Sequence, residues 1–139
     1  MNKALNAELI EIVEKKVLLS SLTYDSKNYD EVEEELHDLE DDFIEEHGDF
    51  LEDIIAVVHE TIKSDSDVLL PIAYLGQRYS KKDKNVDGTI RFEAEFGEGV
   101  LIETEKYPNK ETRLVLVPSP LRLELLVSNA KKEVVWEDK

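Results

Sequence analysis

The first half of the sequence carries apolar residues at helical spacing. The clearest case is the segment beginning at residue 29, where the apolar positions are Tyr29, Val32, Leu36, Leu39 and Phe43. Their separations of 3, 4, 3 and 4 residues place them on one side of a helix. Almost every residue between them is acidic, so the opposite side is expected to face solvent. The pattern therefore predicts an amphipathic helix over this segment.

Local signals predict that this helix ends at Gly48 and that a third one begins directly afterwards. Glycine is a common residue just past a helix C-terminus. Asp49 can cap a new helix, with Glu52 three residues further on as its capping-box partner. Residues 50–62 then supply a broad apolar face. This predicts two helices in succession.

A first helix is predicted near the N-terminus. Its apolar stripe consists of Leu5, Leu9, Ile12 and Val13. Lys16 falls on the same stripe, so we expect the regular helix to end or turn near that residue. Residues 17–24 could continue this helix or form a strand, and helix is the favoured interpretation.

The second half of the chain alternates with a period of two, which is typical of strands. Apolar residues alternate with charged ones over residues 90–96 and again over 121–127, where Leu126 is the exception. Further strands are expected at residues 70–79, 100–105, 112–117 and 133–137. Gly97-Glu98-Gly99 is interpreted as a hairpin turn, because a strand pattern follows it and not the helix that a dinucleotide fingerprint needs.

Helices followed by strands predict the α+β class. We expect two or three N-terminal helices packed on a curved antiparallel sheet, or on a partly open barrel, of five to six strands. The length of 139 residues suits one domain. Within that domain, residues 1–67 form the helical half and residues 68–139 the strand half.

Charge is distributed very unevenly between the two halves. Residues 1–67 contain 5 Lys, no Arg and 21 acidic residues, and so carry the entire formal net charge of −16. Residues 68–139 contain 12 basic and 12 acidic residues. Between Asp30 and Asp53 there are 14 acidic residues and no Lys or Arg. Like charges at i, i+4 destabilise a helix. An acidic run of this density is therefore interpreted either as a solvated helix face or as a surface for a basic partner.

Several chemistries are excluded by composition. The chain has no cysteine, which removes disulfides, thiolate metal sites and cysteine nucleophiles. It also has no Gly-x-Ser-x-Gly elbow and no Walker-type phosphate loop, and no cofactor is predicted. Glu8 and Glu11 interrupt any apolar secretion signal, and the longest uncharged run, Val68 to Gln77, is too short to span a membrane. The expected location is the cytoplasm, without membrane contact.

Two patterns suggest a metal, and neither is favoured. The segment Asp83-Lys84-Asn85-Val86-Asp87-Gly88 resembles the start of an EF-hand calcium loop, in which Asp83, Asn85 and Asp87 would supply oxygen ligands to a weakly bound cation. However, the bidentate Glu expected at the twelfth position is Ala94, so a hairpin loop is the preferred interpretation. His37 belongs to a single Glu-x-x-His motif and is predicted to face solvent, and His47 lies at the edge of its helix's apolar face.

The leading functional hypothesis is a non-enzymatic binding module for a basic protein partner, comparable in size and charge with secretion chaperones, adaptors and toxin-neutralising immunity proteins. The residues expected to steer the partner are Glu33, Glu34, Asp38, Asp41, Asp42 and Glu45. One alternative is a small-ligand binder or enzyme with a pocket between helices and sheet, as in the nuclear-transport-factor-like superfold, which the helix-then-strand order loosely resembles. Its candidate polar lining residues are His47, Tyr74 and Tyr79. A second alternative is a homo-oligomer that buries the apolar stretch 114–121. Nucleic-acid binding is not expected, because the acidic half would repel phosphates.

Overall fold

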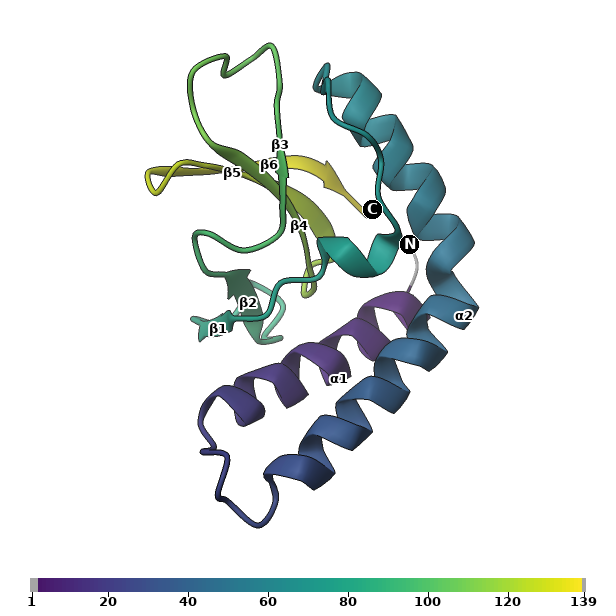
Figure 1. Ribbon diagram of the computed structural model, residues 1–139, viewed down its shortest axis with the longest axis vertical. Coiled ribbons are helices and arrows are strands. Elements are labelled where there is room, and N and C mark those ends of the chain that lie inside the picture. Colours follow the sequence, from purple (N-terminus) through teal and green to yellow (C-terminus); the bar gives the residue numbers. More distant parts are fainter. Residues whose placement is uncertain (1–2, 139) are drawn as a thin grey trace.

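The computed structural model describes residues 3–138 and has the α+β architecture that the sequence predicts. Two helices, α1 (Lys3–Ser20) and α2 (Tyr29–Thr61), precede a short 3₁₀ helix, η1 (Pro71–Tyr74), and six strands. Figure 1 shows α1 packed along the N-terminal half of α2, while the C-terminal half of α2 runs past the strands. The paired helices therefore extend beyond the sheets at the end where residues 21–28 connect them.

The predicted break at Gly48 is wrong, because α2 is one continuous helix of 33 residues. Gly48 lies inside it in helical conformation. The buried stripe explains why: Phe43, His47, Leu51 and Ile55 recur every four residues across the glycine and face the core together. Continuous burial outweighs the roughly 1 kcal/mol that an interior glycine costs relative to alanine.

The first helix does not end or turn near Lys16, and the favoured helical interpretation of residues 17–24 is confirmed for residues 17–20. The α1 helix continues to Ser20, so residues 17–20 are helical and the remainder up to residue 24 forms turns. Lys16 stays on the buried stripe because its ammonium group finds partners there: Nζ donates to the Gly76 carbonyl at 2.8 Å and lies 3.5 Å from a Glu40 carboxylate oxygen. Burial lowers the pKa of Lys16, and Glu40 partly offsets that effect.

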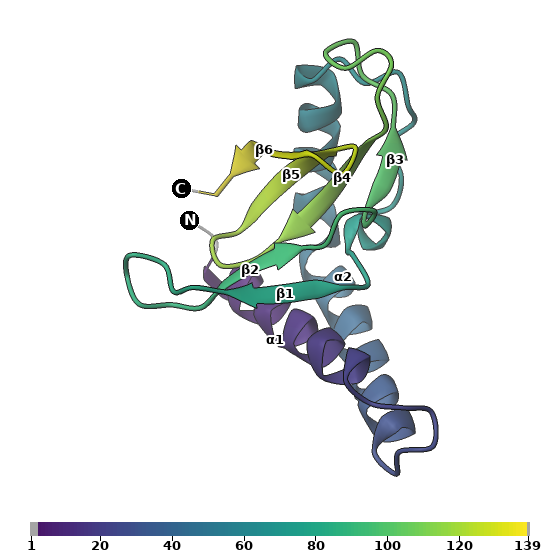
Figure 2. The same ribbon diagram turned by 90° about the vertical axis from the view of Figure 1, so that its left-hand side faces the viewer.

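The six strands form two antiparallel sheets, as Figure 2 shows. The smaller sheet is a hairpin of β1 (Tyr79–Lys82) and β2 (Arg91–Ala94). The larger sheet has the order β3-β4-β5-β6, and its strands are β3 (Val100–Ile102), β4 (Thr112–Val117), β5 (Arg122–Val127) and β6 (Lys131–Glu137). All four follow one another along the chain and pair as a meander, with a register irregularity between β5 and β6 at Leu123/Glu124. The sheet is open, which agrees with the predicted curved sheet.

Two predictions for the strand half are wrong in detail. Residues 70–79 are not a strand, because Pro71 begins the 3₁₀ helix η1, and β1 lies instead in the following basic segment. Gly97-Glu98-Gly99 is a turn, but not a hairpin turn, because it connects β2 of one sheet to β3 of the other. The Glu98 carboxylate accepts a hydrogen bond from the Arg78 backbone N–H at 3.1 Å, which ties this turn to the start of β1.

The core is filled from both sides of the larger sheet. All six residues of β5 are buried, and so are five of the six residues of β4. One side of the sheet lies over the C-terminal half of α2, and the β1–β2 hairpin lies between α1 and the sheet (Figure 2). The apolar stretch 114–121 is consequently covered within the chain itself, so it offers no surface for the predicted oligomer contact.

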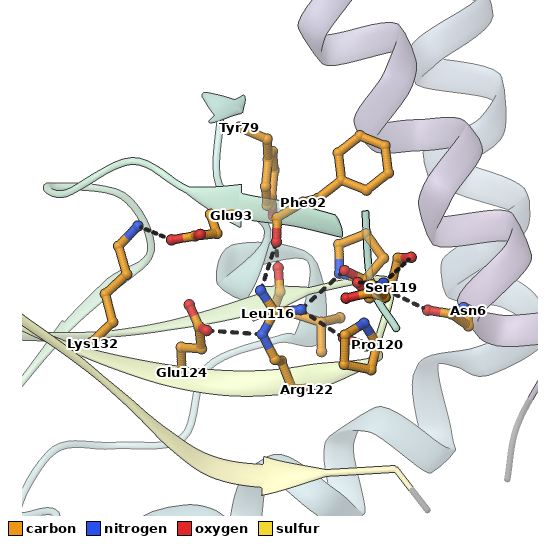
Figure 3. A network of polar contacts seen from close by, with 12 residues as sticks. Asn6, Tyr79, Phe92, Glu93, Leu116, Ser119, Pro120, Arg122, Glu124 and Lys132 are labelled. Carbon is orange, nitrogen blue, oxygen red and sulfur yellow. Dashed lines mark hydrogen bonds and ion pairs between the residues drawn. The ribbon is translucent and has the colours of Figure 1, made fainter. Parts of the chain in front are cut away.

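A buried polar network connects the two sheets (Figure 3). Arg122 is 0% exposed. Its guanidinium donates to the Glu124 carboxylate at 2.8 Å and to the Phe92 carbonyl of β2 at 2.6 Å. It also donates to the carbonyls of Pro118 and Pro120, at 3.1 and 2.8 Å. One arginine thus holds the β4–β5 turn and the β1–β2 hairpin in place.

Candidate functional site: an acidic groove between the two helices

A groove of about 760 Å³ lies between α1 and α2, and one side of it borders β1. The lining residues are Glu11, Glu14, Lys15, Val17, Leu18 and Ser21 of α1 and the turn that follows it, Glu35, Asp38, Leu39 and Asp42 of α2, and Lys81 of β1. The helices pack through their apolar stripes, so their flanking positions, rich in acidic residues, form the two walls.

The walls of the groove carry a clear excess of negative charge. Five of the lining residues are carboxylates and two are lysines. One lysine, Lys15, is neutralised by Glu35 across the groove, with Nζ 2.5 Å from the carboxylate oxygen. All five carboxylates belong to exposed residues, and all lie in residues 1–67, the half of the chain that carries the entire formal net charge. Such a surface attracts cationic partners and repels anions.

Apolar side chains form part of the same groove. Leu18 is 44% exposed, and Val17 and Leu39 are half-buried beside it. An exposed leucine flanked by carboxylates offers an apolar contact, which a partner with an apolar side can make and a simple counterion cannot. The groove is therefore suited to a ligand that presents an apolar side and positive charge together.

The six acidic residues predicted to bind a partner divide into two groups. Asp38 and Asp42 line the groove. Glu33, Glu34, Asp41 and Glu45 lie on α2 outside that lining, and all but the half-buried Glu33 are exposed. The contribution of α1, through Glu11, Glu14 and Leu18, was missed, because sequence alone does not show which face of one helix lies beside the other.

The histidines have different surroundings. His37 is exposed on α2, as predicted. His47 is buried, and its Nε2 is hydrogen-bonded to the Glu8 carboxylate of α1. The Glu46 carboxylate lies 3.8 Å from the same nitrogen. The neighbouring Glu8 raises the pKa of Glu46, through a hydrogen bond and through its negative charge.

His59 lies in a buried network at the end of α2. Its Nε2 is 2.8 Å from the Tyr74 hydroxyl, and its Nδ1 is 3.0 Å from the Ser64 hydroxyl. Tyr74 accepts the Leu69 N–H and Ser64 accepts the Ser66 N–H. We assign a neutral ring that accepts at Nε2 and donates from Nδ1, because the fully buried Tyr74 hydroxyl needs an acceptor for its proton and His59 Nε2 lies within hydrogen-bond distance. Burial lowers the pKa of His59, and the network fastens η1 to α2.

We expect His59 to make the protein less stable in mild acid. Its pKa in the folded state is lower than in the unfolded chain, so unfolding takes up a proton as the pH falls below about 6.5. Stability from this residue is complete above that pH and decreases by at most about 1.4 kcal/mol per pH unit below it. Thermal unfolding at a series of pH values measures the effect. The slope should shrink in His59→Gln and persist in His37→Gln, and equal slopes in all three proteins would contradict the assignment.

The loop that resembles an EF-hand joins β1 to β2, as the hairpin interpretation predicts. The Asp87 carboxylate accepts hydrogen bonds from the Thr89 N–H at 3.0 Å and from its hydroxyl at 2.6 Å, and these lower the pKa of Asp87. The Asn85 amide donates to the Ser119 carbonyl at 3.1 Å. Two of the proposed ligand side chains thus already serve to order the loop, and cation binding there stays a prediction.

The pocket hypothesis named His47, Tyr74 and Tyr79 as polar lining residues. The structure gives each of these three side chains its own hydrogen-bond partners, and for His47 the partner is the partly exposed Glu8. Tyr74 is bound to His59, and the Tyr79 hydroxyl donates to the Leu116 carbonyl and accepts the Gly76 N–H, both at 2.8 Å. Burial raises the pKa of Tyr79. These hydroxyls brace the core, and they do not converge on a common cavity.

Comparison with known proteins adds no family to this geometry. No protein-family model matches the sequence, and no similar curated protein or solved structure is found. Neither helix within residues 3–138 has the length and hydrophobicity needed to cross a membrane. The functional argument therefore depends on the groove itself.

Proposed function

We propose that the protein is a cytoplasmic, non-enzymatic binding module whose groove accepts a basic, amphipathic segment of a protein partner. The observation that carries the proposal is the combination of five carboxylates with an exposed Leu18 in one groove between α1 and α2. Negative charge steers a cationic segment and the apolar contact holds it. No chemical step is required.

The shape of the groove favours a helical occupant. It follows two packed helices, and a third amphipathic helix can place its apolar residues against Leu18 and Leu39 at i, i+3 and i+4. Lys or Arg residues beside this stripe would then lie against the carboxylates of Asp38 and Asp42. Arginine and lysine on a partner also relieve the repulsion between the acidic residues.

The test is the binding of fluorescent peptides to the purified protein, followed by anisotropy. The probe is an amphipathic helical peptide of Leu, Lys and Arg, and the controls are a scrambled peptide of the same composition and a counterpart with Glu in place of the basic residues. We expect saturable binding of the amphipathic basic peptide alone. Affinity should fall between about 0.1 M and about 1 M salt, where the Debye length shrinks from about 10 Å to about 3 Å.

Matched charge reversals locate the binding surface. Asp38→Lys with Asp42→Lys changes two groove residues, and we expect at least about a tenfold loss of affinity. Glu34→Lys with Glu45→Lys makes the same change in charge on exposed positions of the same helix outside the groove, and should change affinity no more than about threefold. If both double variants lose affinity equally, attraction is diffuse and the groove is not the site. If no peptide binds saturably, the proposed function is wrong.

A further inference from the structure

We propose that Glu8, Glu46 and His47 form a binding site for a divalent transition-metal ion that links α1 to α2. One imidazole nitrogen and one oxygen from each carboxylate lie within 4.8 Å of one another. Glu8 belongs to α1, whereas Glu46 and His47 are consecutive in α2. The site is separate from the groove lining, and it does not depend on the proposed peptide binding.

The histidine distinguishes this cluster from the many acidic residues on α2. The side chain of His47 is 8% exposed, although His37 on the same helix is exposed. The ring packs against Phe43, with centroids 5.4 Å apart, and its Nε2 points to the two carboxylates. A buried imidazole held in one orientation supplies a nitrogen donor at little entropic cost.

The two carboxylates complete a set of three candidate ligands. Glu8 is hydrogen-bonded to His47 Nε2, and the nearest Glu46 oxygen is 3.8 Å from that nitrogen. A metal ion with bonds of about 2.0–2.2 Å separates its ligands by roughly 3.5 Å, so only a small adjustment is needed. The Glu46 side chain is 57% exposed and free to make it.

The donor set selects the class of metal. Imidazole with carboxylates suits zinc, manganese and similar transition ions, whereas calcium and magnesium prefer oxygen ligands alone. Zn²⁺ should therefore bind more tightly than Mn²⁺, and Mg²⁺ should bind least. Because Glu46 and Glu8 reach the surface, water would complete the coordination, as at an open metal site.

The test uses the full chain without an affinity tag, since a polyhistidine tag would bind the same ions. Titration with CoCl₂ is followed by visible absorption, and ZnCl₂, MnCl₂ and MgCl₂ are compared by calorimetry and by thermal unfolding. We expect one Zn²⁺ per chain, a cobalt spectrum with nitrogen and oxygen ligation, and a rise in Tm of about 3 °C or more at saturation.

Variants separate the site from general attraction to an acidic surface. Glu8→Gln and His47→Gln should each weaken Zn²⁺ binding at least about tenfold. Glu45→Gln and His37→Gln remove the same residue types from exposed positions on α2 and should leave it unchanged. Glu8→Gln keeps the test valid if His47→Gln does not fold, because Glu8 is partly exposed. Equal binding by all four variants, or no saturable binding, would show that the cluster only joins the helices by a histidine–carboxylate hydrogen bond.

Discussion

Replacing Arg122 by methionine is expected to lower the free energy of unfolding by about 3–5 kcal/mol. The side chain is fully buried and its guanidinium donates to Glu124 and to three backbone carbonyls. Methionine fills similar volume but donates nothing, so Glu124 would remain as a buried carboxylate without its cation. Glu124 Oε1 already has no hydrogen-bond partner among the described residues, which leaves no second partner to compensate.

Urea unfolding followed by the fluorescence of Trp136 and by circular dichroism measures this loss. The tryptophan on β6 reports on the sheet and the dichroism reports mainly on the helices, so coincident transitions also test two-state unfolding. Arg113→Met on the neighbouring strand is the matched control. Arg113 is partly exposed and contacts Glu111 at 3.3 Å, so its loss should cost less than about 1 kcal/mol.

A double variant separates the ion pair from the remaining hydrogen bonds. In Arg122→Met with Glu124→Leu, the unpaired buried charge is gone, and part of the lost stability should return. The carbonyls of Phe92, Pro118 and Pro120 still lack their donor, so recovery should be incomplete. A cost for Arg122→Met no larger than that for Arg113→Met would contradict the role assigned to this network.

The same arginine marks the limit of prediction from the strand pattern. Alternation over 121–127 correctly placed a strand, but it implied that Arg122 and Glu124 face solvent. They are buried because the β1–β2 hairpin covers that side of the sheet, and a single strand's pattern contains no information about a second layer. Leu126, the exception to the alternation, shares that side with them and is 1% exposed, so it was the signal that the side is covered.

The helical half shows a comparable division. The apolar spacing predicted where α1 and α2 form and which sides they bury. Local rules at Gly48 and Lys16 failed because tertiary packing supplied what each residue lacked: a continuous buried stripe around the glycine, and the Gly76 carbonyl and Glu40 for the lysine. The charge pattern predicted a partner-binding surface on α2 alone, whereas the groove is lined by residues of both α1 and α2. The hydrogen bond between His47 of α2 and Glu8 of α1 also depends on how the two helices pack, so the prediction that His47 lies at the edge of its apolar face could not reveal it.

Gly99→Ala is expected to cost more than about 3 kcal/mol, because two unfavourable effects act at one residue. Gly99 has φ +91°, a conformation that L-residues adopt only with strain. A Cβ there would lie 2.5 Å from the Leu114 carbonyl oxygen and 2.9 Å from the Val115 Cβ. Both belong to β4, which is buried and paired on both sides, so the backbone cannot move away cheaply.

Gly97→Ala separates the two effects, because Gly97 has nearly the same φ, +89°, and nothing lies within 4 Å of its Cβ position. Its substitution should cost about 1–2 kcal/mol, the strain of the conformation alone. The difference between the two variants in urea unfolding then measures the steric conflict with β4. Equal costs would mean that β3 and the turn shift to accept the methyl group. A large difference would establish that Gly99 sets how closely the turn from the hairpin approaches the larger sheet, and thereby how the two sheets pack.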